Sequence, residues 1–170
     1  MIIKQGNVLH TPIRCIAHQV NCQGVMGGGV ARQIKALYPN VYDDYVSYIK
    51  DYKELYNKSP LGECFICETN ELIDDAHIIM NVFGQDRYGT DRRYTDYNAL
   101  KDGLMKGIDY LQDLSRSGKC WMGQNFSIAI PYNIGCGLAG GDWKVVKEIL
   151  ENIEAIKDVL FVAYNYNRGR

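Results

Sequence analysis

Two glycine-rich segments have the composition and setting of a phosphate-binding backbone. Residues 21–31 read Asn-Cys-Gln-Gly-Val-Met-Gly-Gly-Gly-Val-Ala, and residues 134–142 read Ile-Gly-Cys-Gly-Leu-Ala-Gly-Gly-Asp. Each lies between an apolar run and an amphipathic helical pattern. Glycine permits positive φ angles and close approach to a ligand, and the first amides of the following helix point outward with the helix dipole behind them. The pair predicts one anionic ligand gripped from both sides.

Neither glycine segment matches a standard nucleotide motif. No Gly-Lys-Ser/Thr closes either one, and neither has the spacing and downstream acidic residue of a dinucleotide fingerprint. For one segment alone, a tight turn without a ligand is an equal alternative. Two segments in equivalent positions favour a binding site.

His18 and Asp142 are candidates for acid–base chemistry, and each has a structural alternative. A histidine with a pKa near neutrality can serve as a general acid, but His18 lies in an apolar run and is equally a core imidazole. Strand alternation puts His18 and Val20 on one face and Gln19 and Asn21 on the other, unless the chain twists near the glycine segment. Asp142 precedes a helical pattern, which favours an N-cap over a catalytic role.

A charged stretch, residues 84–93, offers further donors and carboxylates. Its three arginines could clamp a phosphate by paired donors, and Asp86 or Asp91 could act on a water. A solvated loop with internal ion pairs is the favoured alternative for each residue. We expect the loop as a whole to border the ligand cleft.

Composition indicates one ordinary globular domain over residues 1–170. The chain is 46% hydrophobic and 23% charged, and 19 basic against 20 acidic residues give a net charge of −1. This balance excludes a global electrostatic footprint for duplex nucleic acid or an anionic membrane. No apolar stretch approaches the roughly 20 residues that cross a bilayer, and the start lacks the features of a signal peptide, so we expect a cytoplasmic protein with no membrane partner.

The cysteines favour buried reduced thiols over a metal site. Six are scattered along the chain, and the pair Cys64 and Cys67 lies in a strand-like run where residues three apart face opposite sides. No second ligand pair stands at a suitable spacing for zinc. We therefore expect no metal and no cofactor.

Alternating strand and helix patterns predict an α/β fold with a mostly parallel sheet. The predicted strands are residues 2–4, 15–20, 63–69, 77–83, 127–130 and 159–164, and the predicted helices are 30–38, 41–56, 97–115 and 143–156. Both glycine segments follow a strand and precede a helix. They are therefore expected at the carboxyl ends of the sheet strands, where open α/β sheets bind ligands.

In combination, five segments resemble the macrodomain, the ADP-ribose-binding fold. They are Gly-Asn-Val-Leu at 6–9, Ile-Ala-His-Gln-Val-Asn at 16–21, the first glycine segment, Ile-Pro-Tyr-Asn-Ile-Gly-Cys-Gly-Leu-Ala-Gly-Gly-Asp-Trp at 130–143, and Phe-Val-Ala-Tyr at 161–164. They span nearly the whole chain in the right order. The sequence is most similar to the branch with ADP-ribose 1''-phosphate phosphatases, terminal ADP-ribose glutamate hydrolases and antitoxins that reverse DNA ADP-ribosylation.

The resemblance implies a three-layer α/β/α sandwich with a mixed, mostly parallel sheet and a cleft across the strand ends. It implies that Asn7 meets the adenine amino group, that Asn21 holds the distal ribose, and that Tyr164 lies near the adenine, although packing is the alternative for this tyrosine. The glycine segments wrap the diphosphate and distal ribose. The other binding residues implied are Gly24, Val25, Met26, Gly27, Gly28, Gly29, Val30, Tyr132, Ile134, Gly135, Cys136, Gly137, Leu138 and Ala139.

The resemblance also frames the catalytic hypotheses. The glutamate hydrolases and DNA-directed antitoxins carry a lysine in the loop after the central strand, and here Gln85 falls near that place. The glutamate hydrolases also carry an aspartate in the second glycine segment, where this chain has Ala139. The phosphatase branch instead has a histidine three residues before the cradle asparagine, as His18 stands before Asn21. The catalytic candidates are therefore His18, Gln85 and Asp142.

The leading functional prediction is a hydrolase on an ADP-ribose derivative. It would remove the terminal phosphate of ADP-ribose 1''-phosphate or release ADP-ribose from a modified protein or nucleic acid. The alternative is a reader that binds ADP-ribose or a related nucleotide without turning it over, and a structural domain with empty glycine loops is a third. The family expectation is a monomer.

Overall fold

A single mixed sheet forms the centre of the protein in the computed structural model, which describes residues 1–69, 77–119 and 126–166. Within these ranges the strand order is β1-β6-β5-β2-β4-β3. The strands are β1 (Ile2–Gln5), β2 (Cys15–Asn21), β3 (Cys64–Glu68), β4 (Ile78–Gln85), β5 (Ser127–Pro131) and β6 (Leu160–Asn165). All neighbouring pairs are parallel except β3 and β4, which are antiparallel.

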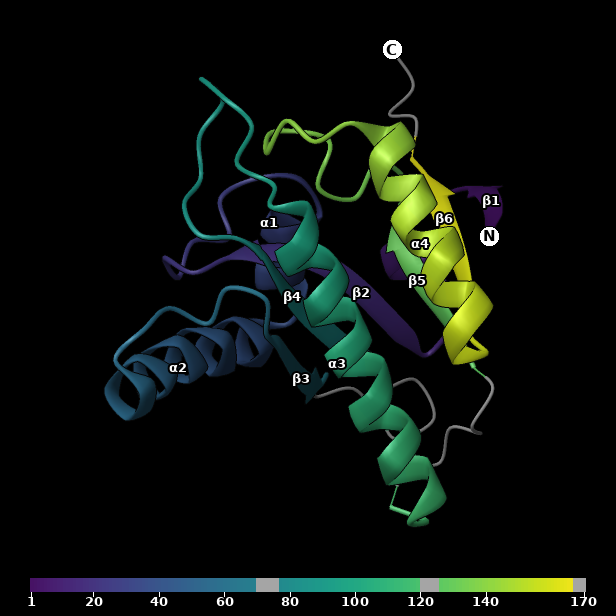
Figure 1. Ribbon diagram of the computed structural model, residues 1–170, viewed down its shortest axis with the longest axis horizontal. Coiled ribbons are helices and arrows are strands. Elements are labelled where there is room, and N and C mark those ends of the chain that lie inside the picture. Colours follow the sequence, from purple (N-terminus) through teal and green to yellow (C-terminus); the bar gives the residue numbers. More distant parts are fainter. Residues whose placement is uncertain (70–76, 120–125, 167–170) are drawn as a thin grey trace.

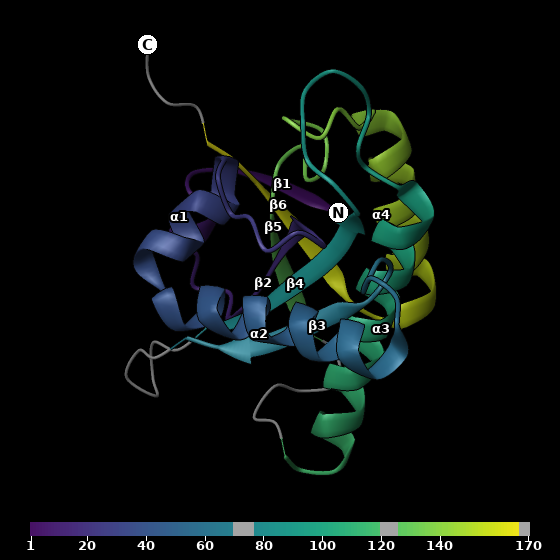
Figure 2. The ribbon, with the colours of Figure 1, turned by 90° about the vertical axis from the view of Figure 1, so that its left-hand side faces the viewer.

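Helices cover both faces of this sheet (Figure 1). They are α1 (Gly29–Leu37), α2 (Pro39–Tyr56), α3 (Tyr97–Arg116) and α4 (Trp143–Lys157), and a 3₁₀ turn, η1 (Val8–His10), follows β1. Figure 2 shows α1 and α2 on one side of the sheet and α3 and α4 on the other. The predicted three-layer α/β/α sandwich with a mixed, mostly parallel sheet is confirmed.

Strand β2 contributes to both hydrophobic cores because its side chains alternate between the two faces. Cys15 and Ala17 pack with α3 and α4, whereas Ile16 and Val20 pack with α1 and α2. A strand buried on both faces reads as a continuous apolar run, as expected for the interior of a parallel sheet. The functional residues at the end of β2 therefore stand on a rigid, central support.

The predicted boundary between β4 and the following loop is wrong by two residues. The strand was expected to end at residue 83, but it continues to Gln85, which pairs with Asn21. Because Gln19 pairs with Val82, the register between β2 and β4 shifts by one residue before that point. Such irregularities re-aim side chains near functional sites. Gly84 and Gln85 thus belong to the sheet and not to the charged loop.

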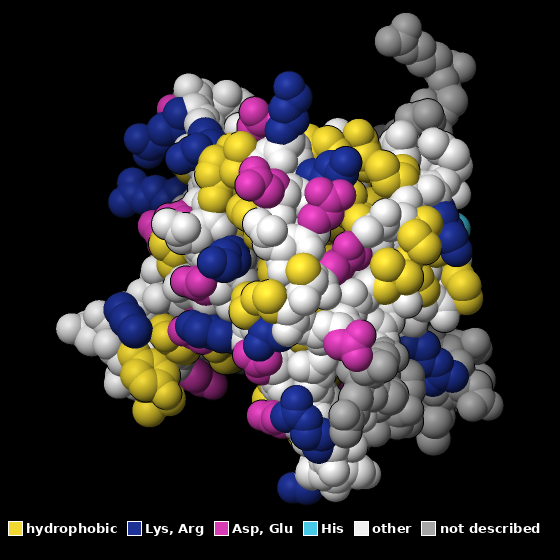
Figure 3. All heavy atoms as spheres, turned by 45° about the vertical axis from the view of Figure 1, so that its right-hand side comes forward, with side chains coloured by type: hydrophobic (Ala, Val, Ile, Leu, Met, Phe, Trp, Pro, Cys, Tyr) yellow, Lys and Arg dark blue, Asp and Glu magenta, His cyan; other side chains and the backbone are white. Residues whose placement is uncertain are grey.

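The surface over α3 and α4 mixes both signs of charge (Figure 3). Lys106 approaches Glu63 at 2.6 Å, and Lys157 approaches Asp109 at 2.5 Å. No helix among the described residues is long and apolar enough to cross a membrane. Of the cysteines in the metal-site argument, Cys64 and Cys67 are partly buried in β3, and Cys120 lies outside the described residues.

Two glycines let α3 lie close against the sheet. A Cβ atom at Gly103 would lie 2.7 Å from the Glu63 carbonyl oxygen and 2.8 Å from Val82. A Cβ atom at Gly107, one turn later, would lie 2.5 Å from Met80. Both glycines are buried. The distance between α3 and the β3–β4 hairpin is therefore set by the absence of these side chains.

Gly103→Ala is expected to lower the free energy of unfolding by about 1 to 3 kcal/mol, although alanine is the better helix former, because the backbone carbonyl of Glu63 would have to move. Urea unfolding measures the change. Lys101→Ala, on the exposed face of the same helix, is the control and should stay within about 0.5 kcal/mol of the unaltered protein. Equal effects of the two substitutions would contradict close helix–sheet contact at Gly103.

Candidate functional site

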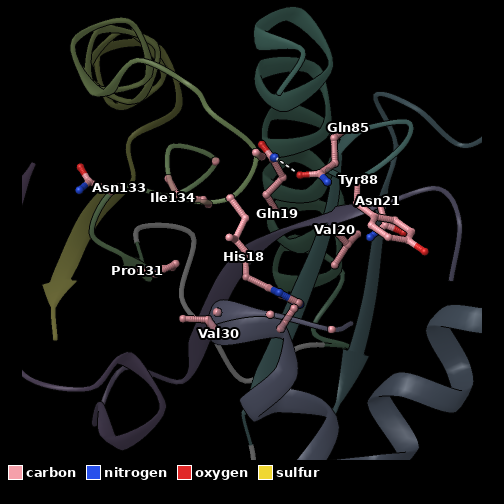
Figure 4. A pocket seen from close by; sticks show the side chains of 18 of the residues that line it. His18, Gln19, Val20, Asn21, Val30, Gln85, Tyr88, Pro131, Asn133 and Ile134 are labelled. Carbon is pink, nitrogen blue, oxygen red and sulfur yellow. Dashed lines mark hydrogen bonds between the residues drawn. The ribbon is translucent and has the colours of Figure 1, made fainter. Parts of the chain in front are cut away.

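A cavity of about 530 Å³ opens at the carboxyl ends of β2, β4 and β5 (Figure 4). Both glycine segments form its walls, as does the loop after β4. The volume lies within the range of about 300 to 1,000 Å³ that is usual for small-molecule sites. Its position is the one where open α/β sheets bind ligands.

Most of the residues predicted for the site line this cavity. They are His18, Asn21, Val25, Gly27, Gly28, Gly29, Val30, Gln85, Tyr132, Ile134, Gly135, Gly137, Leu138 and Ala139. They come from segments far apart in the sequence, which the sheet brings together. Their individual roles with a ligand stay predictions.

Six predicted residues do not line the cavity: Asn7, Gly24, Met26, Cys136, Asp142 and Tyr164. Asp142 is the N-cap of α4 and accepts from the Lys144 amide at 2.8 Å. This is the geometry expected for an N-cap, the alternative to a catalytic role. Asn7 accepts from the Leu9 amide as the N-cap of η1. The Tyr164 ring is buried, and its hydroxyl accepts from Thr11 at 2.8 Å.

Sequence reasoning missed part of the wall. The unpredicted lining residues are Gln19, Val20, Ala31, Tyr88, Gly89, Thr90, Pro131 and Asn133. From the sequence, Gln19 was assigned only to one face of its strand. The signal that could have identified it as a site residue is its polar side chain close to a glycine segment. Tyr88, Gly89 and Thr90 agree with the expectation that the charged loop borders the cleft. The loop's Arg92 and Arg93 instead lie over the rings of Tyr94 and Tyr97, outside the cavity lining.

Asn21 organises the first glycine segment through its side chain. Its Oδ1 accepts from the backbone amides of Gln23 at 3.0 Å and Val25 at 3.3 Å, and its Nδ2 donates to the Val25 carbonyl oxygen at 2.7 Å. These bonds close the turn that leads to the glycines. The sequence predicted that Asn21 holds the distal ribose. In the structure, most of the hydrogen-bonding capacity of this side chain is used within the loop itself.

Helix α2 braces the same segment from behind. The Tyr45 hydroxyl lies 2.6 Å from the Asn21 carbonyl oxygen and 3.1 Å from its Oδ1. Tyr42 donates to the Gly24 carbonyl oxygen at 3.1 Å, and Lys53 donates to the Cys22 carbonyl oxygen at 3.1 Å. Strand alternation would place Asn21 on the α3 face, but it contacts Tyr45 of α2, at the point where β2 leads into the glycine segment.

The two glycine segments meet at the mouth of the cavity. A Cβ atom at Gly28 would lie 2.5 Å from Cδ1 of Leu138, which is 64% exposed. A side chain at position 28 would displace the exposed Leu138 side chain. The close approach fits segments that enclose a ligand between them.

His18 is buried beside the cavity and is held by one hydrogen bond, between Nε2 and Asn81 Oδ1 at 2.8 Å. Asn81 donates its amide to the Phe65 carbonyl oxygen, so its Oδ1 faces His18 and the ring carries its proton on Nε2. Nδ1 is then an acceptor, with no partner among the described residues. Burial lowers the pKa of His18 to about 4, against a smaller raising effect of Asn81. At neutral pH the ring is therefore uncharged and its one N–H donates to Asn81, which favours the core-imidazole alternative.

The fold and the cleft define a class: an α/β/α sandwich that binds ligands at its strand ends between two glycine segments. The Macro domain family model matches residues 17–150. The chain belongs to this family, as its resemblance predicted. Across residues 1–69, 77–119 and 126–166, no group of three His, Cys, Asp or Glu side chains could hold a metal ion.

Proteins similar to this chain are named for two activities. An ADP-ribose 1''-phosphate phosphatase of Saccharomyces cerevisiae is 27% identical over 94% of this chain and 95% of its own length. A DNA ADP-ribosyl glycohydrolase of Mycobacterium tuberculosis is 27% identical over 96% of this chain, which spans 42% of that protein. The solved macrodomain of Mycobacterium tuberculosis DarG superimposes with a TM-score of 0.73 and covers 96% of this chain and 97% of its own.

Asn21→Ala is expected to lower the free energy of unfolding by about 2 to 4 kcal/mol, because two loop amides and one carbonyl lose their partners. Hydrogen exchange should show the Gln23 and Val25 amides losing protection. The control is Tyr45→Phe, which removes only the bond from α2 and should cost about 1 kcal/mol while the two amides stay protected. Protected amides in Asn21→Ala would disprove the role of this side chain.

The stability of the protein should depend on pH through His18. The pKa is about 4 in the fold against an ordinary 6.5, so between these values the unfolded chain binds the proton more strongly. The stabilising contribution of the neutral His18 ring is therefore complete above pH 6.5. It is lost as the pH falls towards 4, which lowers the free energy of unfolding by roughly 3 kcal/mol. Urea unfolding from pH 7 to 4 should therefore show a shallower fall for His18→Gln. Equal slopes would argue against a buried neutral ring.

Proposed function

We propose that this protein is a hydrolase of an ADP-ribose derivative, and that ADP-ribose 1''-phosphate is its first candidate substrate. One observation carries the proposal: both glycine segments, with backbone amides suited to anions, line the same cavity. The named activities of the two kinds of relative both concern ADP-ribose joined to another group at its distal end. Release of ADP-ribose from a modified macromolecule is also a hydrolysis, but it breaks a glycosidic bond in place of a phosphate ester bond.

Positioning and amide stabilisation would supply most of the rate in this site. Backbone donors aimed at developing negative charge act strongly where water is excluded. Gln85 and the second glycine segment would lie against the group being removed. His18 would contribute packing beneath the cavity, since its ring is buried and neutral at pH 7. A protonated His18 acid does not fit this geometry.

The second candidate function is a reader that binds the nucleotide without hydrolysing it. Two features of the sequence favour the reader: residues 84–93 contain no lysine, and position 139 is alanine. A reader needs the cavity and nothing more. The two candidates therefore differ in turnover and agree in binding.

The test is to incubate the protein with ADP-ribose 1''-phosphate, and separately with ADP-ribosylated protein and DNA, and to follow phosphate and free ADP-ribose over time. Calorimetry with ADP-ribose measures binding in parallel. The hydrolase proposal predicts release of phosphate that is lost in Gly135→Val, because position 135 has a φ of +72° and lies against Gln19. Lys101→Ala, remote from the cavity, serves as the active control.

Each outcome assigns the function. Phosphate release supports the phosphatase, and free ADP-ribose from modified protein or DNA moves the assignment to that substrate. Binding of ADP-ribose without turnover of any substrate makes the protein a reader. No binding of ADP-ribose would overturn both candidates.

A further inference from the structure

A chain of polar side chains joins the two walls of the cavity through Gln19. Gln19 Nε2 lies 2.6 Å from Gln85 Oε1 and 2.9 Å from the hydroxyl of Thr95. Thr95 donates to the Gly135 carbonyl oxygen at 2.5 Å, and Gln85 Nε2 donates to the Arg87 carbonyl oxygen at 3.0 Å. The network thus connects β2, the end of β4, the start of α3 and the second glycine segment.

The direction of every bond in this network is fixed by its two ends. Both ends are backbone carbonyls, which only accept hydrogen bonds. Thr95 has one hydroxyl proton and gives it to Gly135, so it accepts from Gln19. Gln85 gives an amide proton to Arg87, so its Oε1 accepts from Gln19. The Gln19 amide therefore donates both of its protons and has a single orientation.

This orientation decides what Gln85 offers a ligand. Its oxygen is occupied by Gln19, and the second N–H of its amide has no partner in the part of the chain that the structure describes. Gln85 lines the cavity, and Figure 4 shows its side chain between Gln19 and Tyr88. Gln85 thus presents a donor to the cavity.

The Gln19 side chain is also tightly confined. Its Oε1 is buried and has no partner among the described residues. A Cβ atom at Gly84 or at Gly135 would lie 2.6 Å from this oxygen. An unpartnered buried acceptor is unfavourable, and in this network it results from the amide donating on its other side. Glycine at these two positions makes the room that Gln19 needs.

We propose that Gln19 is a positioning residue that acts through Gln85, and that Gln85 donates to a phosphoryl oxygen on the distal ribose of the ligand. The inference rests on the proposed function for the identity of the ligand. The amide of Gln85 is a neutral hydrogen-bond donor whose direction is fixed by Gln19 and Arg87. An anionic oxygen is the acceptor that gains most from such a donor.

A double-mutant cycle tests the positioning role. The variants are Gln85→Leu, Gln19→Met and the double variant, each with its thermal midpoint recorded. Affinities for ADP-ribose 1''-phosphate and ADP-ribose are measured by displacement of fluorescent ADP-ribose in the first seconds after mixing, before product accumulates. ADP-ribose lacks the distal phosphate and is therefore the matched control ligand.

The expected result is specific to one ligand. Each single substitution weakens the binding of ADP-ribose 1''-phosphate by about 10- to 100-fold and the binding of ADP-ribose by less than about 3-fold. The double variant binds ADP-ribose 1''-phosphate no more weakly than Gln85→Leu, because in this proposal Gln19 acts on the distal phosphate through Gln85, and the ADP-ribose control reports any effect through Thr95 and Gly135. Additive losses, or equal losses for both ligands, would overturn the inference and leave the proposed function standing.

Thr95 gives a second, independent pair of variants in case Gln19→Met folds poorly. Thr95→Val removes the hydroxyl that fixes the Gln19 amide, and Thr95→Ser keeps it. Only the valine variant should lose affinity for ADP-ribose 1''-phosphate, and indistinguishable affinities would count against the network. If the unaltered protein binds neither nucleotide, the proposed function fails and this inference fails with it.

Discussion

The hydrogen bonds of the Asn21 side chain are the interaction on which the cavity depends. A glycine-rich backbone has many accessible conformations, and its ordering must be compensated by specific bonds. The Asn21 side chain supplies such bonds to the first glycine segment. Tyr45 and Lys53 of α2 donate to backbone carbonyl oxygens at the start of the same segment. The central strand β2 thereby extends its rigidity into the loop. Without that support the amides would have no common direction.

The residues that line the cavity offer dipoles to a ligand, and none of these lining residues is an Asp, Glu, Lys or Arg. The loop arginines at 92 and 93 lie over tyrosine rings, and the cavity is lined by glycine backbone, amide side chains, apolar and aromatic side chains and one neutral imidazole. Preorganised dipoles need no reorganisation when charge arrives. Neighbouring residues of β2 take part in different ways: His18 faces the α1–α2 core, and Gln19 faces the α3–α4 side.

The sequence predicted the elements well, because each strand and helix had the matching apolar period, and it predicted the two glycine segments because their composition is unusual. It could not predict the Gln19–Thr95–Gly135 connection, which joins positions far apart in the chain by side-chain geometry. It also could not choose between the two roles of His18. That choice depends on burial and on Asn81, whose place opposite His18 follows from the pairing of β2 with β4.

The shift in register between β2 and β4 has a consequence for how this site can vary. Gln19 pairs with Val82 but Asn21 pairs with Gln85, so one additional residue is accommodated on β4 just before the cavity. Deleting a residue there would turn the amide at position 85 to the opposite side of the sheet. A substitution at this position can therefore change the chemistry offered to the cavity, but only if the length of the strand that carries it is kept.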